Sequence, residues 1–102
     1  MTIYISGRIT GDSGYREKFS EAEKSLKDAG YDTFNPATLC IPDGEWLAAM
    51  RAALRLMLKS NGVALLDDWS ESKGAAIEAR LAQAVGIPVK PLREWVKEEG
   101  GK

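Results

Sequence analysis

The sequence contains no histidine and a single cysteine among its 102 residues. Without histidine, Ser-His and Cys-His catalysis are excluded, and the usual zinc sites lose their commonest ligand. Cys40 has no second cysteine to pair with in the chain, which fits a reducing compartment such as the cytoplasm. We therefore expect no metal and no cofactor, and we expect acid–base work to fall to carboxylates, tyrosine, lysine or the substrate itself.

Long apolar runs and a strong net charge are also missing. No apolar stretch approaches the roughly 20 residues that span a bilayer, and the N-terminus lacks a signal-peptide pattern. The formal net charge of −1 gives no electrostatic reason to bind nucleic acid or an acidic membrane. With 44% hydrophobic and 28% charged residues, the sequence predicts one soluble, cytoplasmic domain with a modest core.

What the chain does have is an alternation of short β-rich runs and segments of helical periodicity. We expect strands at residues 2–5, 31–34, 62–66 and 87–89, and helices at about 15–29, 45–59, 72–85 and 92–99. The second helix is expected to turn inward Trp46, Leu47, Met50, Leu54, Met57 and Leu58. This order predicts a single-domain α/β fold over residues 1–99: a Rossmann-like, doubly wound sheet of about four mostly parallel strands with helices on both faces. Residues 100–102 are expected to fray.

One glutamate stands in an unusual place on the third predicted helix. At about 100° per residue, one broad face of this helix carries Ala75, Ile77, Leu81, Ala82 and Val85, with Glu78 near its middle. A charge on a core-facing stripe costs several kcal/mol unless it is paired or opens onto a cavity. Glu78 is therefore interpreted as a site residue, and the alternative is a core carboxylate satisfied by hydrogen bonds. Tyr4 is either a core residue or a donor that orients Glu78.

The predicted strand ends place further polar residues at one edge of the sheet, where open parallel sheets bind ligands. The loop after the first strand contains Ser6, Gly7, Arg8, Ile9, Thr10 and Gly11, which could hold an anion or form an ordinary strand-to-helix connection. Ser72 is a plausible N-cap, and Gly74 would let a ligand approach the helix start. Asp67, Asp68 and Trp69 follow the third strand. The aspartates either cap a loop or contact a substrate ring or hydroxyl, and Trp69 would offer the substrate a flat apolar surface. Asn35 is more typical of a turn than of a ligand site.

Taken together, these segments resemble the nucleoside 2-deoxyribosyltransferase-like superfamily, in particular its small phage and prophage-type branch, related to the 2′-deoxynucleoside 5′-phosphate N-hydrolases. The segments are Tyr4-Ile5-Ser6-Gly7-x-Ile9-Thr10-Gly11, Asn35-Pro36-Ala37, Leu65-Leu66-x-x-Trp69 and Ser72-Lys73-Gly74-Ala75-x-x-Glu78. The resemblance implies N-glycosidic chemistry on a deoxynucleoside or its 5′-monophosphate, with Glu78 as the nucleophile at C1′ and Tyr4 in support. It also implies a homodimer, and a 5′-phosphate bound by Ser6, Gly7, Arg8, Ile9, Gly11 and Ser72.

The chain departs from that family on the second helix. An aspartate that assists departure of the base is replaced by Ala53, which could cost roughly 10²–10⁴ in rate. Asp68 or Asp67 could substitute for it from the neighbouring strand. Otherwise the chain is a nucleotide-binding or nucleotide-sequestering protein with the same pocket. A third hypothesis is a partner-binding protein in which Trp46 and Trp95 serve an interface.

Overall fold

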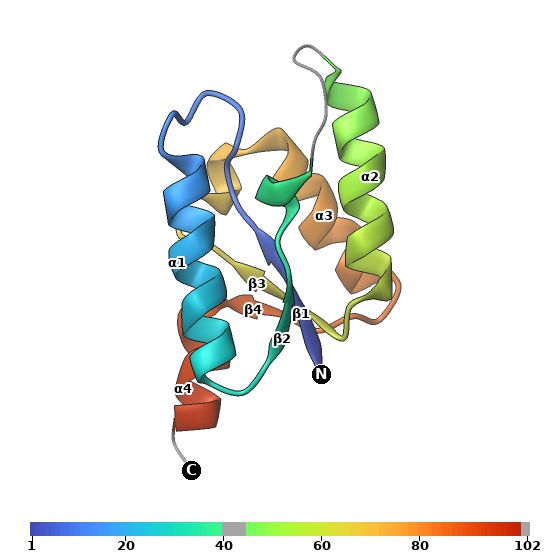
Figure 1. Ribbon diagram of the computed structural model, residues 1–102. Coiled ribbons are helices and arrows are strands. Elements are labelled where there is room, and N and C mark those ends of the chain that lie inside the picture. Colours follow the sequence, from blue (N-terminus) through green and yellow to red (C-terminus); the bar gives the residue numbers. More distant parts are fainter. Residues whose placement is uncertain (40–44, 101–102) are drawn as a thin grey trace.

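A computed structural model describes residues 1–39 and 45–100 of the chain (Figure 1). Four strands alternate with four α-helices and two short 3₁₀ helices. In chain order these are β1 (Thr2–Ser6), α1 (Tyr15–Asp28), β2 (Asp32–Phe34), η1 (Pro36–Thr38), α2 (Trp46–Lys59), β3 (Gly62–Leu65), η2 (Trp69–Glu71), α3 (Lys73–Ala84), β4 (Val89–Pro91) and α4 (Leu92–Gly100). The predicted order of elements is confirmed, with boundaries shifted by one or two residues.

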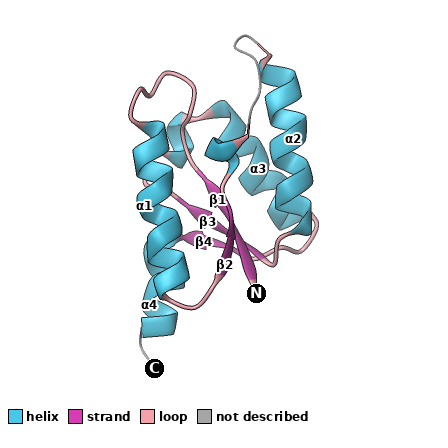
Figure 2. Cartoon of the chain, in the orientation of Figure 1, coloured by secondary structure: helices cyan, strands magenta, loops and turns pink. Residues whose placement is uncertain are grey.

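The four strands form one sheet in the order β2-β1-β3-β4, and every pair of neighbours runs parallel. Tyr4 in β1 lies opposite Phe34 on one side and Val63 on the other, so the first strand of the chain is central. Parallel strands need crossover connections, and the helices supply them (Figure 2). The expected α/β fold class is confirmed.

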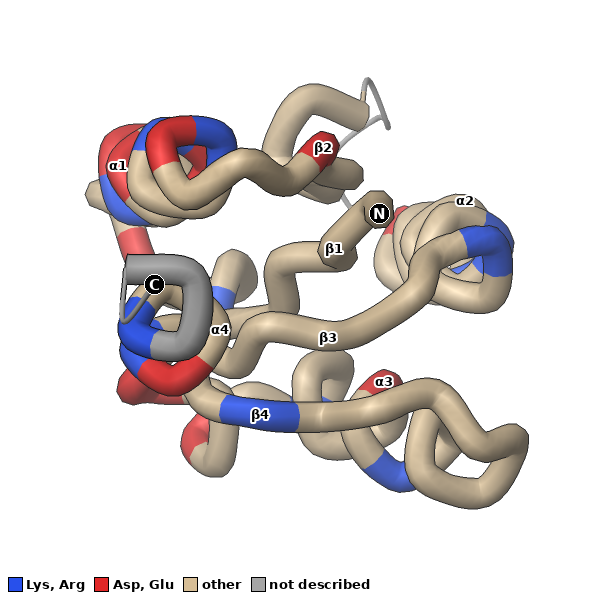
Figure 3. The backbone as a smooth tube through the Cα atoms, turned by 90° about the horizontal axis from the view of Figure 1, so that it is seen from below, with Lys and Arg blue, Asp and Glu red and all other residues tan. Residues whose placement is uncertain are grey.

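The helices cover both faces of the sheet, with α1 and α4 on one face and α2 and α3 on the other (Figure 3). Two separate cores result, because successive side chains of a strand point to opposite faces. The α1/α4 core is built on Ile3, Ile5, Phe19, Ala22, Leu26, Ala64, Leu66 and Trp95. The α2/α3 core is built on Tyr4, Ala53, Met57, Val63, Leu65, Ala79 and Ala82. The second core therefore contains polar Tyr4 and small alanines, which leaves room near Glu78.

The inner faces predicted for α2 and α3 were partly wrong. Leu47 and Leu58 are 65% and 51% exposed, whereas Ala53 and Met57 are the buried residues of α2. On α3, Ile77 and Val85 are exposed and the alanines near Glu78 are buried. Apolar residues surround most of the circumference of α2, so their spacing alone does not select the buried side.

The C-terminal segment corrects one further expectation. Trp95 is 2% exposed and donates its indole N–H to the Val63 carbonyl at 2.8 Å, so it belongs to the core rather than to an interface. Gly100 ends α4. Cys40 and residues 101–102 lie outside the described residues. Within the described part of the chain, no helix is long and apolar enough to cross a membrane.

Candidate active site

Glu78 is buried beneath the sheet edge, with 5% of its surface exposed. The Tyr4 hydroxyl donates to Glu78 Oε2 at 2.6 Å, and the Ser6 hydroxyl donates to Oε1 at 2.8 Å. Tyr4 and Ser6 are two positions apart in β1, so their side chains leave the same face of the strand. Each carboxylate oxygen of Glu78 therefore has its own hydrogen-bond donor, so this buried acid is not left without polar partners.

Burial changes the acidity of this pair. Removal from water raises the pKa of Glu78 to about 7, although the hydrogen bonds from Tyr4 and Ser6 oppose the shift. Burial, together with the neighbouring Glu78 charge, raises the pKa of Tyr4 far above its usual range. Near neutral pH, Tyr4 therefore remains a donor while Glu78 exchanges between its charged and neutral forms.

A cavity of about 100 Å³ opens beside Glu78. Its walls come from β1 and the following loop, from η1, and from the facing sides of α2 and α3. The lining residues are Tyr4, Gly7, Ile9, Thr10, Pro36, Trp46, Ala49, Met50, Ala53, Ser72, Gly74, Ala75 and Glu78. Six of the expected site residues therefore line one cavity: Tyr4, Gly7, Ile9, Ser72, Gly74 and Glu78. Ser6 does not line it but is hydrogen-bonded to Glu78.

The start of α3 forms one wall of this cavity. Ser72 is its N-cap, as expected, because the Ser72 hydroxyl oxygen accepts a hydrogen bond from the Ala75 backbone N–H at 3.1 Å. A Cβ atom at Gly74 would lie 3.2 Å from the Met50 sulfur, so glycine permits the close approach of α2 and α3. Glu78 follows one turn later on the buried side of α3.

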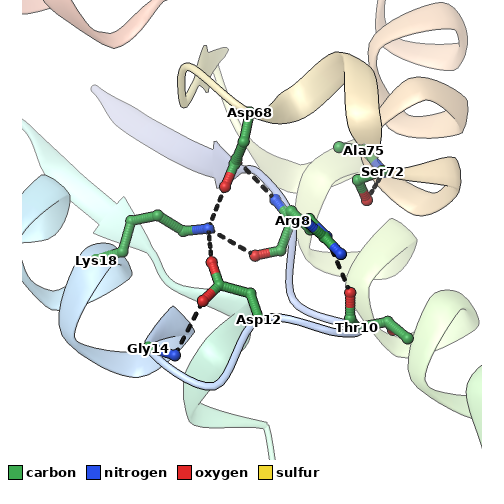
Figure 4. Close-up of polar contacts among 8 residues, drawn as sticks. All are labelled: Arg8, Thr10, Asp12, Gly14, Lys18, Asp68, Ser72 and Ala75. Carbon is green, nitrogen blue, oxygen red and sulfur yellow. Dashed lines mark hydrogen bonds and ion pairs between the residues drawn. The ribbon is translucent and has the colours of Figure 1, made fainter.

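Lys18 ties the β1–α1 loop to the segment after β3 (Figure 4). Its ammonium donates to the Arg8 carbonyl at 2.9 Å, to Asp12 Oδ2 at 2.6 Å, and to Asp68 Oδ2. Asp68 Oδ1 accepts from the Arg8 backbone N–H at 3.0 Å. Both polar groups of the Arg8 backbone are therefore fixed, immediately before Ile9 and Thr10 enter the cavity wall.

These contacts also set the charges of the cluster. Burial favours the neutral form of Lys18, but its hydrogen bonds to Asp12 and Asp68 outweigh it and raise the lysine pKa. Burial likewise opposes ionisation of Asp68, yet the Lys18 and Arg8 N–H contacts lower its pKa overall. All three side chains remain charged near neutral pH.

The remaining expected residues lie outside the cavity. Asp68 is held by Lys18 and Arg8, and it does not line the cavity as a catalytic acid would. Trp69 packs against the α2/α3 core. The Asn35 side chain accepts from the Ala37 N–H as the cap of η1. The Arg8 guanidinium donates to the Thr10 carbonyl and would contact any side chain at Gly11, whose φ of +83° requires glycine.

Sequence reasoning missed the contribution of α2 to the cavity wall. From α2, the residues Trp46, Ala49, Met50 and Ala53 line the same cavity as Glu78. Trp46 and Met50 had been assigned to a continuous inner face, because apolar residues that line a cavity have the same spacing as core residues. Lys18 was also missed, since one lysine on an exposed-looking helix carries no signal until its partners are known.

A larger hollow of about 540 Å³ lies on the other face of the sheet, between α1 and α4. Its lining includes apolar Leu66, Leu92 and Val96. It also includes charged Lys18, Asp68 and Arg93. Neither Glu78 nor Tyr4 reaches it. Among the residues whose side chains the structure describes, 1–39 and 45–97, no three Cys, Asp or Glu side chains are grouped as a metal site.

Comparison with known proteins agrees with this architecture. The fold is similar to that of a 2-deoxyribosyltransferase from the psychrotolerant bacterium Bacillus psychrosaccharolyticus, with a TM-score of 0.68 and 22% sequence identity. The likeness covers 87% of this chain and 69% of that chain. No curated protein matches the sequence significantly. A family model described as a domain of unknown function, DUF4406, matches residues 1–91, and the chain therefore belongs to the DUF4406 family.

Proposed function

We propose that the protein is a cytoplasmic N-glycosidase or deoxyribosyltransferase that acts on a deoxynucleoside 5′-monophosphate or deoxynucleoside. The observation that carries this proposal is the buried Glu78 carboxylate, oriented by Tyr4 and Ser6 at the wall of a cavity. Support also comes from the fold, which is shared with a protein described as a 2-deoxyribosyltransferase. The kinship with phage-type proteins and with 5′-phosphate N-hydrolases is part of the same proposal.

In this mechanism the ionised Glu78 attacks C1′ of the sugar, and the base departs with the bonding electrons. Water then hydrolyses the glycosyl ester, or a second base accepts the sugar. The hydrogen bonds from Tyr4 and Ser6 hold the two Glu78 oxygens in place, so little reorientation precedes attack. A carboxylate nucleophile at an oxocarbenium-like centre needs no histidine.

The start of α3 and the loop after β1 are the proposed binding surfaces for the rest of the substrate. Gly7 and Ile9 line one side of the cavity, and Ser72 and Gly74 line the other. A phosphate at the N-terminus of α3 would be attracted by the helix dipole. The cavity of about 100 Å³ is smaller than the roughly 300–1,000 Å³ of typical ligand sites, so it would enclose the reacting centre and leave part of the ligand outside.

One observation favours a second candidate function, a nucleotide-binding protein with impaired catalysis. Ala53 lines the cavity at the position where the resemblance implies an acid that assists departure of the base. Asp68, which could replace that acid, is bound by Lys18 outside the cavity. A protein of this kind would bind the same ligand without releasing its base.

The proposed homodimer has a candidate surface on α2. Leu47, Leu54 and Leu58 fall on one stripe of this helix, and Leu47 and Leu58 are more than half exposed. A second copy of the chain packed on this stripe would bury these leucines. They belong to α2, the same helix whose other side lines the cavity.

The experiment that tests the proposed function measures release of free base by chromatography. The purified protein is incubated with deoxy- and ribonucleoside monophosphates and free nucleosides, with and without an acceptor base. Release that disappears in Glu78→Gln supports the enzyme, and dependence on the acceptor separates transfer from hydrolysis. Ligand-induced thermal stabilisation without release in wild type supports the binding protein instead.

A further inference from the structure

The cavity wall that faces Glu78 is apolar. From α2 it receives Trp46, Ala49, Met50 and Ala53, and from other segments Ile9 and Pro36. Within the described lining, the ionisable side chains are Tyr4 and Glu78, and both belong to the same hydrogen bond. Among the described residues that line the cavity, none besides Glu78 carries a carboxyl group and none carries an ammonium that could protonate a departing group.

Neither member of this pair can protonate a leaving base while Glu78 attacks. Glu78 must be ionised to act as a nucleophile, and the Tyr4 proton is donated to it at 2.6 Å. Asp68, the alternative acid considered above, accepts from Lys18 and the Arg8 N–H and does not line the cavity. Ser72 and Thr10 contribute hydroxyls, which are weak acids.

Resting on the proposed function, we infer that this site selects N-glycosides whose base carries a positive charge, such as an N-alkylated purine or a pyridinium. A neutral base departs as an anion and needs a proton in the transition state. A cationic base departs as a neutral molecule and needs none. An apolar wall without an acid is therefore matched to the second class of substrate.

The steps balance with water as the one co-reactant. Glu78 Oε forms a bond to C1′, while the C1′–N bond breaks and its electron pair neutralises the cationic ring. Water then attacks the glycosyl ester, which releases the sugar, regenerates the Glu78 carboxylate and yields one proton. No reductant, oxidant or proton donor is required.

The charge of Glu78 also favours such a ring. The Lys73 ammonium lies 4.9 Å from the Trp46 ring centroid, but Lys73 is exposed, so solvent screens its repulsion of a cationic ring. A cation in the cavity would attract the Glu78 carboxylate and oppose the effect of burial, which otherwise keeps part of Glu78 protonated.

A matched pair of substrates and one variant test this inference. The substrates are 2′-deoxyguanosine 5′-monophosphate and its N7-methyl derivative, which share sugar and phosphate and differ in the methyl group and the positive charge that it gives the base. Each is incubated near pH 7 with wild type, Ala53→Asp, and Ala53→Asn as a size-matched control, and spontaneous base loss is subtracted. Ala53→Asp is expected to raise kcat/KM for the unmethylated substrate by about tenfold or more, and for the methylated one by less than about twofold.

The ratio between variants cancels the intrinsic lability of the methylated base. Equal stimulation of both substrates, or wild type that cleaves the unmethylated substrate at least as fast, overturns the inference and leaves the proposed function standing. No release from either substrate by any protein overturns both. If Ala53→Asp does not fold, acetic acid added to wild type serves the same purpose: it should accelerate cleavage of the unmethylated substrate selectively, and equal acceleration contradicts the inference.

Discussion

Lys18 and Asp68, fifty positions apart, form an ion pair that joins the loop after β1 to the segment after β3. The pair acts on the site through the Arg8 backbone: Lys18 binds its carbonyl and Asp68 binds its N–H. Because Ile9 and Thr10 follow directly in the cavity wall, this contact fixes the shape of the cavity without any contribution to its chemistry.

Asp68→Asn distinguishes this structural role from the catalytic one considered above. The amide keeps an acceptor for Arg8 but loses the charge that binds Lys18, so the free energy of unfolding should fall by about 1–2 kcal/mol. We expect kcat to change by less than about tenfold. Chemical denaturation and base-release kinetics provide both measurements, with Lys18→Met as the matched partner variant. A rate loss of roughly 10²–10⁴ at unchanged stability would instead indicate a catalytic acid.

The stability of the protein should decrease as pH rises from about 5 to 8. Burial raises the pKa of Glu78 from 4.5 to about 7, so in this range the folded state retains a proton that the unfolded state has released. The folded state therefore loses up to roughly 3 kcal/mol of stability across the interval. Asp12 and Asp68 have lowered pKa values, so their contributions to the free energy of unfolding are lost only at more acidic pH. They do not change the slope between pH 5 and 8.

Urea denaturation at several pH values measures this slope, and Glu78→Gln is the control. The amide has no charge to bury, so its stability should be nearly flat over the same range. An equal slope in both proteins would assign the pH dependence to another group.

Tyr4→Phe should move the activity profile to higher pH. The Tyr4 hydroxyl stabilises the ionised form of Glu78, so its removal raises the Glu78 pKa above the value of about 7. Base release by wild type should increase with an apparent pKa near 7, and by Tyr4→Phe with a higher one. Ser6→Ala should act in the same direction through Oε1. A fall in rate without a shift of the profile would mean that Tyr4 serves packing alone.

Two glycine-to-alanine variants should separate folding from ligand access. At Gly7 the added methyl would lie 2.7 Å from Leu66 Cδ1 and 2.9 Å from Leu66 Cβ, which predicts a loss of about 1–3 kcal/mol in stability. At Gly74 it would meet the flexible end of Met50 at 3.2 Å, and the helix gains propensity. Gly74→Ala should therefore keep its melting temperature and weaken ligand binding, as thermal denaturation and calorimetry can show.

The dimer proposal predicts that Leu58→Glu produces monomers. A charge on the exposed leucine stripe of α2 would have to be buried in the interface, at a cost of several kcal/mol. Light scattering during size-exclusion chromatography measures the mass. Ser20→Glu, on exposed α1 at the opposite face of the sheet, adds the same charge and should leave the mass unchanged. A wild-type protein that is monomeric at all concentrations contradicts the proposal.

The sheet and its connections were predictable because the local signals agreed with one another. The run from Thr2 to Ser6 is β-rich, Gly30 ends the turn after α1, and Ser72 caps α3. Glu78 could be singled out because a carboxylate among apolar residues breaks the helical pattern. The Tyr4 contact was one of two alternatives left open for that residue, whereas the hydrogen bond from Ser6, which was expected in a phosphate-binding loop, was not predicted.

The cavity wall and the Lys18 contacts could not be read from spacing. Met50 and Ala53 look like core residues at helical intervals, and whether they touch another side chain or an open space depends on how closely α2 approaches α3. Asp68 was expected near Glu78 because the carboxyl ends of parallel strands lie at one edge of the sheet. Its side chain instead points across the edge of the sheet to Lys18, a direction that depends on tertiary structure.

The central position of β1 has a consequence for how the molecule is made. β1, which carries Tyr4 and Ser6, is translated before its partner β3 and the acid on α3, which follow about 60 to 75 residues later. Until then β1 can pair only with β2, which follows about 30 residues after it, and its pairing with β3 is non-local and therefore slow. Truncated chains that end before β3 should consequently be recognised by chaperones or aggregate, because they leave one edge of β1 unpaired.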